Sequence, residues 1–136
     1  MLPLVLVASA RPRAQRIAMV YKDASCGCCT KWVELLQKSG FAVTTRDITE
    51  MDTSKYGVPS SLRSCHTAVI DGHIVEGHVP MADIQRMLKQ GATVAGLAVP
   101  GMPVGSPGME VQGAAAQRYS VIAFDKTFKT RVFASY

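Results

Sequence analysis

The chain has 136 residues, of which 48% are hydrophobic and 18% are charged, and its formal net charge is +5. This composition is typical of a single globular domain with a buried core, and it excludes a disordered chain. No stretch reaches the roughly 18–20 apolar residues of a membrane-spanning helix, and four cysteines are too few for a disulfide-dense miniprotein.

The positive charge does not indicate a nucleic-acid partner. The excess of Lys and Arg lies in residues 1–16 and 118–136, and the long segment between them is nearly neutral. A nucleic-acid-binding module would instead gather basic residues on one face beside exposed aromatic residues. We therefore expect no nucleic acid among the partners.

The N-terminal segment, residues 1–16, has the features of an export signal. The apolar run LPLVLVASA at residues 2–10 ends in small residues and is followed by Arg-Pro-Arg, as at a secretory cleavage site, although a basic leader is missing. A first strand or a disordered tail is the alternative. We expect a signal-peptide remnant over residues 1–16 and one domain over residues 17–136.

The first regular elements are predicted to be a strand, a helix and a second strand. The apolar run at residues 17–21 predicts a buried strand, and residues 41–48 predict another of mixed polarity. Between them, Gly40 is a helix stop. Since the connection is helical, the two strands should be parallel. The inner face of this helix would consist of Cys29, Trp32, Val33 and Leu36.

A hairpin follows a turn-rich segment at residues 49–64. Residues 67–70 and 73–77 read as two strands, and Asp71-Gly72 between them is a strong hairpin turn. We expect this antiparallel pair to extend the sheet.

The rest of the chain is predicted as a helix, a loop and two strands. Pro80 opens the helix and Gly91 ends it. Glycine and proline interrupt residues 91–116 so often that we expect an apolar loop packed over the domain. Residues 119–124 and 130–133 read as a final pair of strands. The helix would pack through Met81, Ile84, Met87 and Leu88.

This order predicts an α/β fold. A Cys-x-x-Cys pair at the junction of a strand and a helix is the arrangement of thioredoxin-like domains. We therefore predict a thioredoxin-like mixed central sheet with flanking helices, followed by the Gly/Pro-rich loop and the C-terminal strands.

The cysteines form a site rather than a scaffold. Cys26 and Cys29 lie three residues apart, so one helical turn brings them together, where they can share a disulfide or a metal ion. Unpaired N–H groups at a helix N-terminus stabilise thiolates, which are both the nucleophiles of disulfide exchange and the form that binds metals. Cys28 is a third sulfur, which a simple dithiol enzyme does not need.

A second pair, Cys65-His66, precedes the strand at residues 67–70, and in thioredoxin-like folds this segment faces the Cys-x-x-Cys loop. Thiolates supported by imidazole suit Cu(I) or zinc. Four sulfurs could bridge several copper ions. Zinc favours one closed tetrahedral site, which the diverging side chains of the adjacent Cys28 and Cys29 make less natural.

Other histidine and methionine residues are weaker candidates. His78, Met102 and Met109 are further candidate ligands, since Met102 and Met109 lie in a Gly/Pro loop where core packing is less compelling. His73 lies beside a hairpin turn and is expected to be solvated. The residues expected to fill the core are Trp32, Met81 and Met87.

Four motifs together resemble the CopG-type copper-resistance family: CGCC at residues 26–29, SCHTA at 64–68, GHVP at 77–80 and GLAVPGMPVGSPGM at 96–109. The resemblance extends from about Val20 to the C-terminus. It implies a thioredoxin-like fold, a cysteine-bridged copper site and a periplasmic role in copper tolerance. It also implies cysteines that cycle between a disulfide and copper-bound thiolates.

The metal-binding residues of that family correspond here to Cys26, Cys28, Cys29, Cys65 and His66. We accordingly expect Cu(I), as one or several ions, and another periplasmic copper or redox protein as a partner. Two alternatives stay open. One is a thiol–disulfide oxidoreductase with Cys26 as the attacking thiolate and Cys29 as the resolving thiol; the other is a zinc-stabilised structural module.

Overall fold

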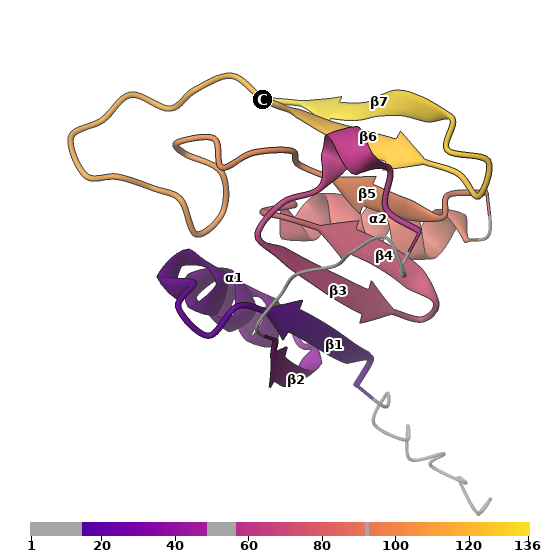
Figure 1. Cartoon of the computed structure of the whole chain (residues 1–136), viewed down its shortest axis with the longest axis horizontal. Coiled ribbons are helices and arrows are strands. Elements are labelled where there is room, and N and C mark those ends of the chain that lie inside the picture. The colour runs from indigo at the N-terminus through magenta and orange to yellow at the C-terminus, as the bar shows by residue number, and fades with distance from the viewer. Residues whose placement is uncertain (1–14, 49–56, 92) are drawn as a thin grey trace, which may run out of the picture.

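The structure, a computed structural model, describes residues 15–48, 57–91 and 93–136 (Figure 1). One mixed sheet of seven strands, in the order β2-β1-β3-β4-β5-β6-β7, runs through these residues together with two α-helices. The elements are β1 (Ile17–Lys22), α1 (Gly27–Lys38), β2 (Ala42–Asp47), the short 3₁₀ helix η2 (Ser60–Leu62), β3 (His66–Ile70), β4 (His73–Glu76), α2 (Met81–Gln90), β5 (Gly96–Ala98), β6 (Ser120–Phe124) and β7 (Thr130–Ser135).

The predicted crossover between parallel strands is confirmed. β1 and β2 pair in parallel from Ile17 opposite Ala42 onward, and α1 connects them. Ser39 caps the end of α1, and Gly40 follows in the left-handed region, with φ of +96°. The helix buries the four side chains expected on its inner face: Cys29, Trp32, Val33 and Leu36.

The predicted hairpin is also confirmed, and it extends the sheet on the other side of β1. β3 lies antiparallel to β1 and β4 lies antiparallel to β3. Asp71 and Gly72 both have positive φ, +49° and +78°, as the two-residue turn favoured in hairpins requires.

The expectation of a loop throughout residues 91–116 is wrong in one respect. β5 lies inside this segment and pairs in parallel with β4 and antiparallel with β6. The sequence did not predict this strand, because three residues that begin with a glycine show no alternation of polar and apolar side chains. Gly96 is needed because a Cβ there would meet the Ile74 carbonyl oxygen at 2.5 Å. The irregular chain after β5 extends past the sheet on the side where α1 begins (Figure 1).

The helix α2 is tied to the last strand by polar contacts. Arg86 donates a hydrogen bond to the Phe133 carbonyl oxygen at 2.6 Å, and the Tyr136 hydroxyl donates to Asp83 at 2.6 Å. Met87 is fully buried, as predicted, whereas Met81 is only partly buried at the edge of the core.

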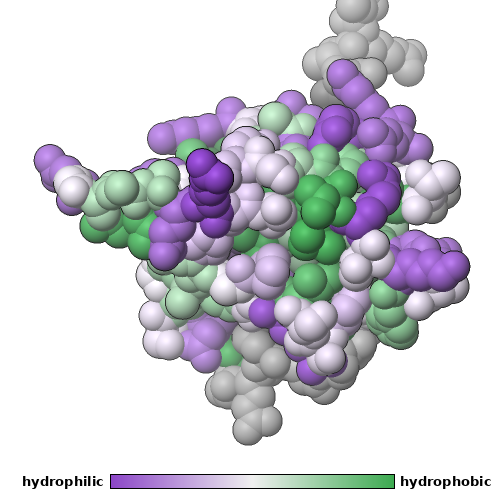
Figure 2. All heavy atoms as spheres, turned by 90° about the horizontal axis from the view of Figure 1, so that it is seen from above, coloured by the Kyte–Doolittle hydropathy of each residue, from purple (hydrophilic) through white to green (hydrophobic). Residues whose placement is uncertain are grey.

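Seen from above, hydrophobic side chains gather near the middle of the face and again at its left edge, and hydrophilic ones lie around them (Figure 2). Phe128 and Val132, in the β6–β7 hairpin, are among the large hydrophobic residues that stay exposed. Neither helix of the described residues is long and apolar enough to span a membrane. The first fourteen residues of the predicted export segment lie outside the described ranges.

Substitution of Gly77, which follows β4, should separate the cost of a positive φ from the cost of a steric clash. A Cβ at Gly77 would lie 2.5 Å from the Val99 carbonyl oxygen, and the φ of Gly77 is +74°. Gly101 has a matching φ of +72° but nothing within 4 Å of its Cβ position. We expect Gly77→Ala to lower the free energy of unfolding by about 3 kcal/mol and Gly101→Ala by about 1 kcal/mol. Urea unfolding measures both, and equal losses would contradict the close approach at Gly77.

Candidate metal centre

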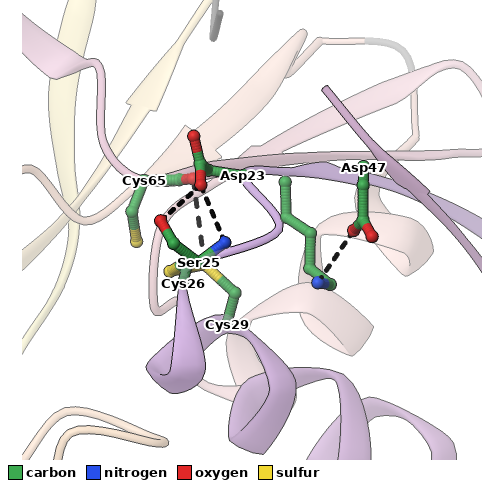
Figure 3. A network of polar contacts seen from close by, with 7 residues as sticks. Asp23, Ser25, Cys26, Cys29, Asp47 and Cys65 are labelled. Atoms are coloured by element: carbon green, nitrogen blue, oxygen red, sulfur yellow. Dashed lines mark hydrogen bonds and ion pairs between the residues drawn. A yellow bond between two sulfur atoms is a disulfide. The ribbon is translucent and has the colours of Figure 1, made fainter. Parts of the chain in front are cut away.

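The turn between β1 and α1 is held by an aspartate. The Asp23 carboxylate accepts hydrogen bonds from the hydroxyl and, at 2.8 Å, from the backbone N–H of Ser25 (Figure 3). These bonds hold the pKa of Asp23 below its ordinary value. The Cys26 N–H donates to the Asp23 carbonyl oxygen at 3.1 Å. The turn therefore fixes Cys26 at the N-cap of α1, directly before the other two cysteines of the cluster.

Cys26 and Cys29 form a disulfide, with their Cα atoms 5.5 Å apart. Cys28 is a free, half-buried thiol in the first turn of α1, and its sulfur lies 3.4 Å from that of Cys26. The N-terminus of α1 favours negative charge, so thiolates are stabilised here once the disulfide is reduced.

Cys65 lies beside this disulfide, as Figure 3 shows. It directly precedes β3, and its carbonyl oxygen is 3.8 Å from the sulfur of Cys29. The sulfur atoms of Cys26, Cys28, Cys29 and Cys65 all lie within 4.8 Å of one another. The expectation that the Cys65-His66 segment meets the helix cysteines is therefore correct in its geometry.

The Cys65 sulfur also lies close to the rings of two histidines. It lies 3.4 Å from Nδ1 of His66 and 3.5 Å from Nε2 of His78. Burial raises the pKa of the Cys65 thiol to about 11, and repulsion from Cys28 adds to this effect. In the state described here Cys65 is thus a neutral thiol, and a metal ion must displace its proton in order to bind.

Both imidazoles are buried and neutral. Burial lowers the pKa of His66 to about 3 and also lowers the pKa of His78. Nδ1 of His78 lies 2.7 Å from the Pro107 carbonyl oxygen. Because a carbonyl can only accept, Nδ1 carries the proton and Nε2 presents its lone pair to Cys65. His78 thus lies at the site, where the sequence left its role open.

The ring of His66 is held by packing. Its centroid lies 4.5 Å from that of Trp32 and 5.1 Å from that of His78. The Nε2 atom of His66 is buried, and no group in the described residues forms a hydrogen bond with it. Trp32 belongs to the core as predicted, and its indole N–H donates to the Val79 carbonyl oxygen at 3.0 Å.

The methionines and the remaining histidine differ in their placement. The Met102 sulfur lies 3.8 Å from that of Cys28, and 52% of Met102 is exposed. Met109 forms backbone hydrogen bonds with Gly105 and Ser106. His73 is half-buried, with Nδ1 2.8 Å from the Val94 carbonyl oxygen, so the expectation that it is solvated is wrong.

The loop after β5 covers part of the site, and Gly108 lies close against it. A Cβ at Gly108 would lie 3.1 Å from the backbone nitrogen of Trp32, 3.2 Å from Nδ1 of His78 and 3.3 Å from the Cys28 carbonyl oxygen. The loop therefore packs directly against the first turn of α1 and against His78. Because glycine has no Cβ, Gly108 allows this close approach, and it also adopts a φ of +87° without strain.

A buried carboxylate that the sequence analysis missed holds the Cys65-His66 segment. Glu76, in β4, accepts a hydrogen bond from the Ser64 N–H at 2.7 Å and another from the Thr67 hydroxyl. One side chain thus binds both residues that flank the pair. Burial raises the pKa of Glu76 to about 6. A charged residue at the end of an apolar strand, just before the GHVP motif, was the available signal.

Comparisons with known proteins identify relatives of this chain. A family described as "Protein of unknown function, DUF411" matches residues 62–109. Two solved structures, "Copper resistance protein copG- Form 1" and "Form 2", are 46% identical to the chain, with TM-scores of 0.84 and 0.85. Each comparison covers 90% of this chain, and 98% and 99% of the respective solved chains. No curated protein matches the chain significantly.

The Glu76 carboxylate should make the stability of the metal-free, disulfide-bonded protein depend on pH. Its pKa rises from 4.5 to about 6, so the folded state binds this proton more tightly. The stabilisation of the folded state by this proton is fully present below about pH 4.5. It is lost as the pH rises through about 6, and the free energy of unfolding falls by about 2 kcal/mol in all. Urea unfolding between about pH 4 and pH 7 should show this loss in the wild type but not in Glu76→Gln.

Glu76→Ala is the matched variant, because it removes the hydrogen bonds as well as the charge. It leaves the Ser64 N–H and the Thr67 hydroxyl without their partner, and we expect a loss of about 2–4 kcal/mol across the whole pH range. Parallel stability curves for the wild type and Glu76→Gln would contradict the raised pKa.

Proposed function

Because the chain belongs to the family of CopG copper-resistance proteins, we propose that it binds Cu(I) through its clustered cysteines and acts in copper resistance. The observation that carries this proposal is the convergence of four sulfur atoms within 4.8 Å of one another. They come from two distant segments, the start of α1 and the residue before β3.

The donor set supports copper in particular. Thiolates are soft ligands that select Cu(I), and His66 and His78 add neutral imidazoles beside Cys65. Sulfurs this close together can each bridge two ions. We therefore propose a thiolate-bridged cluster of several Cu(I) ions, held by Cys26, Cys28, Cys29, Cys65 and His66.

The disulfide supports a redox cycle. Cys26 and Cys29 cannot supply thiolates while they are bonded to each other, so loading requires two electrons that break the S–S bond. A dithiol of a partner protein can supply both electrons and become a disulfide itself. Alternatively, two Cu(I) ions can supply one electron each and become Cu(II). We propose a copper or redox protein as the partner.

We propose a periplasmic location. Disulfides form and persist in oxidising compartments, and the N-terminal sequence has the features of an export signal. We also propose that the fold is thioredoxin-like, since the Cys-x-x-Cys pair begins the helix of the β1-α1-β2 unit and antiparallel strands β3 and β4 follow.

A thiol–disulfide oxidoreductase is the second candidate, because the disulfide itself favours it. Cys26 is half-buried and Cys29 is fully buried, so Cys26 is the sulfur that a substrate can reach. Turnover of a disulfide substrate by metal-free protein, lost in Cys26→Ser, would identify this activity.

Removal of the two sulfurs outside the disulfide should weaken copper binding. We expect the reduced protein to bind Cu(I) with sulfur ligation and Cys28→Ser/Cys65→Ser to bind it about tenfold or more weakly. Anaerobic Cu(I) titration against a chelator, with X-ray absorption on the loaded protein, measures both. Met81→Leu, at the edge of the core, is the control that should behave as the wild type. Unchanged binding by the double variant would refute the proposal.

Met102 should slow the release of copper from the exposed side of the site. Its sulfur is 3.8 Å from Cys28, so it can join the coordination as a soft ligand. We expect Met102→Leu to transfer Cu(I) to a chelator about threefold or more faster than the wild type, since one soft ligand is lost. Stopped-flow transfer measures the rate. Met109→Leu, in the same loop, should leave it unchanged, and equal effects of both variants would contradict a specific role.

A further inference from the structure

We propose that Cys65, His66 and His78 form a second metal subsite, which takes one divalent ion of the zinc type while the Cys26–Cys29 disulfide is intact. This inference deepens the proposed function, on which it rests, because the subsite shares Cys65 with the copper site. The three ligand atoms lie within 4.8 Å of one another.

The site has two halves that respond differently to oxidation. Cys26, Cys28 and Cys29 belong to the start of α1, and the disulfide removes two of these three sulfurs as ligands. Cys65, His66 and His78 belong to the β3–β4 hairpin and its flanks, and none of them takes part in the disulfide. The oxidised protein therefore keeps one thiol and two imidazoles together.

The two imidazoles are ready to bind a metal ion. The hydrogen bond from Nδ1 of His78 to Pro107 leaves Nε2 with its lone pair toward Cys65. His66 directs Nδ1 toward the same sulfur, and no hydrogen bond within the described residues fixes the proton on its other nitrogen.

Hydrogen bonds between β3, β4 and their flanks hold the backbone around Cys65 and His66. Glu76 binds Ser64 and Thr67 on either side of the Cys65-His66 pair. The Gly77 N–H donates to the His66 carbonyl oxygen at 3.1 Å. None of these bonds involves a cysteine of α1, so they do not depend directly on whether the disulfide is formed.

One thiolate and two imidazoles form a donor set of the kind that zinc takes, with a fourth position to be filled. The fourth coordination position can take water or Cys28, the other free thiol, whose sulfur is within 4.8 Å of that of Cys65. An ion bound here would occupy Cys65 and prevent it from pairing with Cys28. It would thus protect the oxidised protein from a wrong disulfide.

The test uses Co(II), which reports thiolate ligation by its charge-transfer band and does not oxidise thiols as Cu(II) does. The full chain is prepared metal-free and oxidised, with two free thiols verified by mass spectrometry. We expect one equivalent of Co(II) to produce a thiolate charge-transfer band, one equivalent of Zn(II) to abolish it, and either ion to slow alkylation of Cys65. Absence of the band would overturn the proposal.

Two variants and one control assign the ligands. His78→Gln should weaken Co(II) binding by about tenfold or more, and Cys65→Ser, at a half-buried position, should abolish the band even if His78→Gln fails to fold. His73→Gln, at the other end of β4, is the matched histidine control and should bind as the wild type does. A band that persists in Cys65→Ser would overturn the proposal.

A parallel titration of the reduced wild type with Cu(I) separates this inference from the proposed function. Copper binding by the reduced protein without Co(II) binding by the oxidised protein would refute the subsite alone. Co(II) binding by the oxidised protein without Cu(I) binding by the reduced protein would refute the copper function alone.

Discussion

The antiparallel pairing of β1 with β3 is the constraint on which the site depends. In this register Lys22, the last residue of β1, lies opposite His66, the first residue of β3. The chain leaves β1 toward the cysteines of α1, and it enters β3 from Cys65. Because the strands run in opposite directions, the end of one and the start of the other share one edge of the sheet. Two cysteine segments thirty-six residues apart in sequence therefore meet there.

The two segments bring different chemistry to that edge. A helix N-terminus favours thiolates, since its unpaired N–H groups and dipole attract negative charge. The sheet side is more buried, which keeps the Cys65 thiol protonated and the imidazoles of His66 and His78 neutral. A metal ion bound by these residues would displace a proton from Cys65 and would bring positive charge to a buried set of ligands.

Several groups around the site hold its residues in place without contacting the sulfurs themselves. Glu76 holds the residues beside the Cys65-His66 pair, Pro107 sets the tautomer of His78, and Gly108 lets the covering loop approach α1. Such partners orient ligands before any ion arrives, and so they reduce the ordering that binding requires. These contacts hold Cys65, His66 and His78, whereas two of the three cysteines at the start of α1 are joined by the disulfide.

Sequence patterns predicted most of the local elements and most of the candidate ligands. Spacing predicted the α1 face around Trp32, turn chemistry predicted the hairpin at Asp71-Gly72, and the motifs predicted the cysteines and His66, with His78 and Met102 as weaker candidates. Features that depend on contacts between distant segments emerged only from the three-dimensional structure. β5 has three residues and no period to read, and Glu76 and Pro107 act on partners far along the chain. Sequence patterns report local periodicity, but burial and hydrogen bonding between distant segments exist only once the strands have paired.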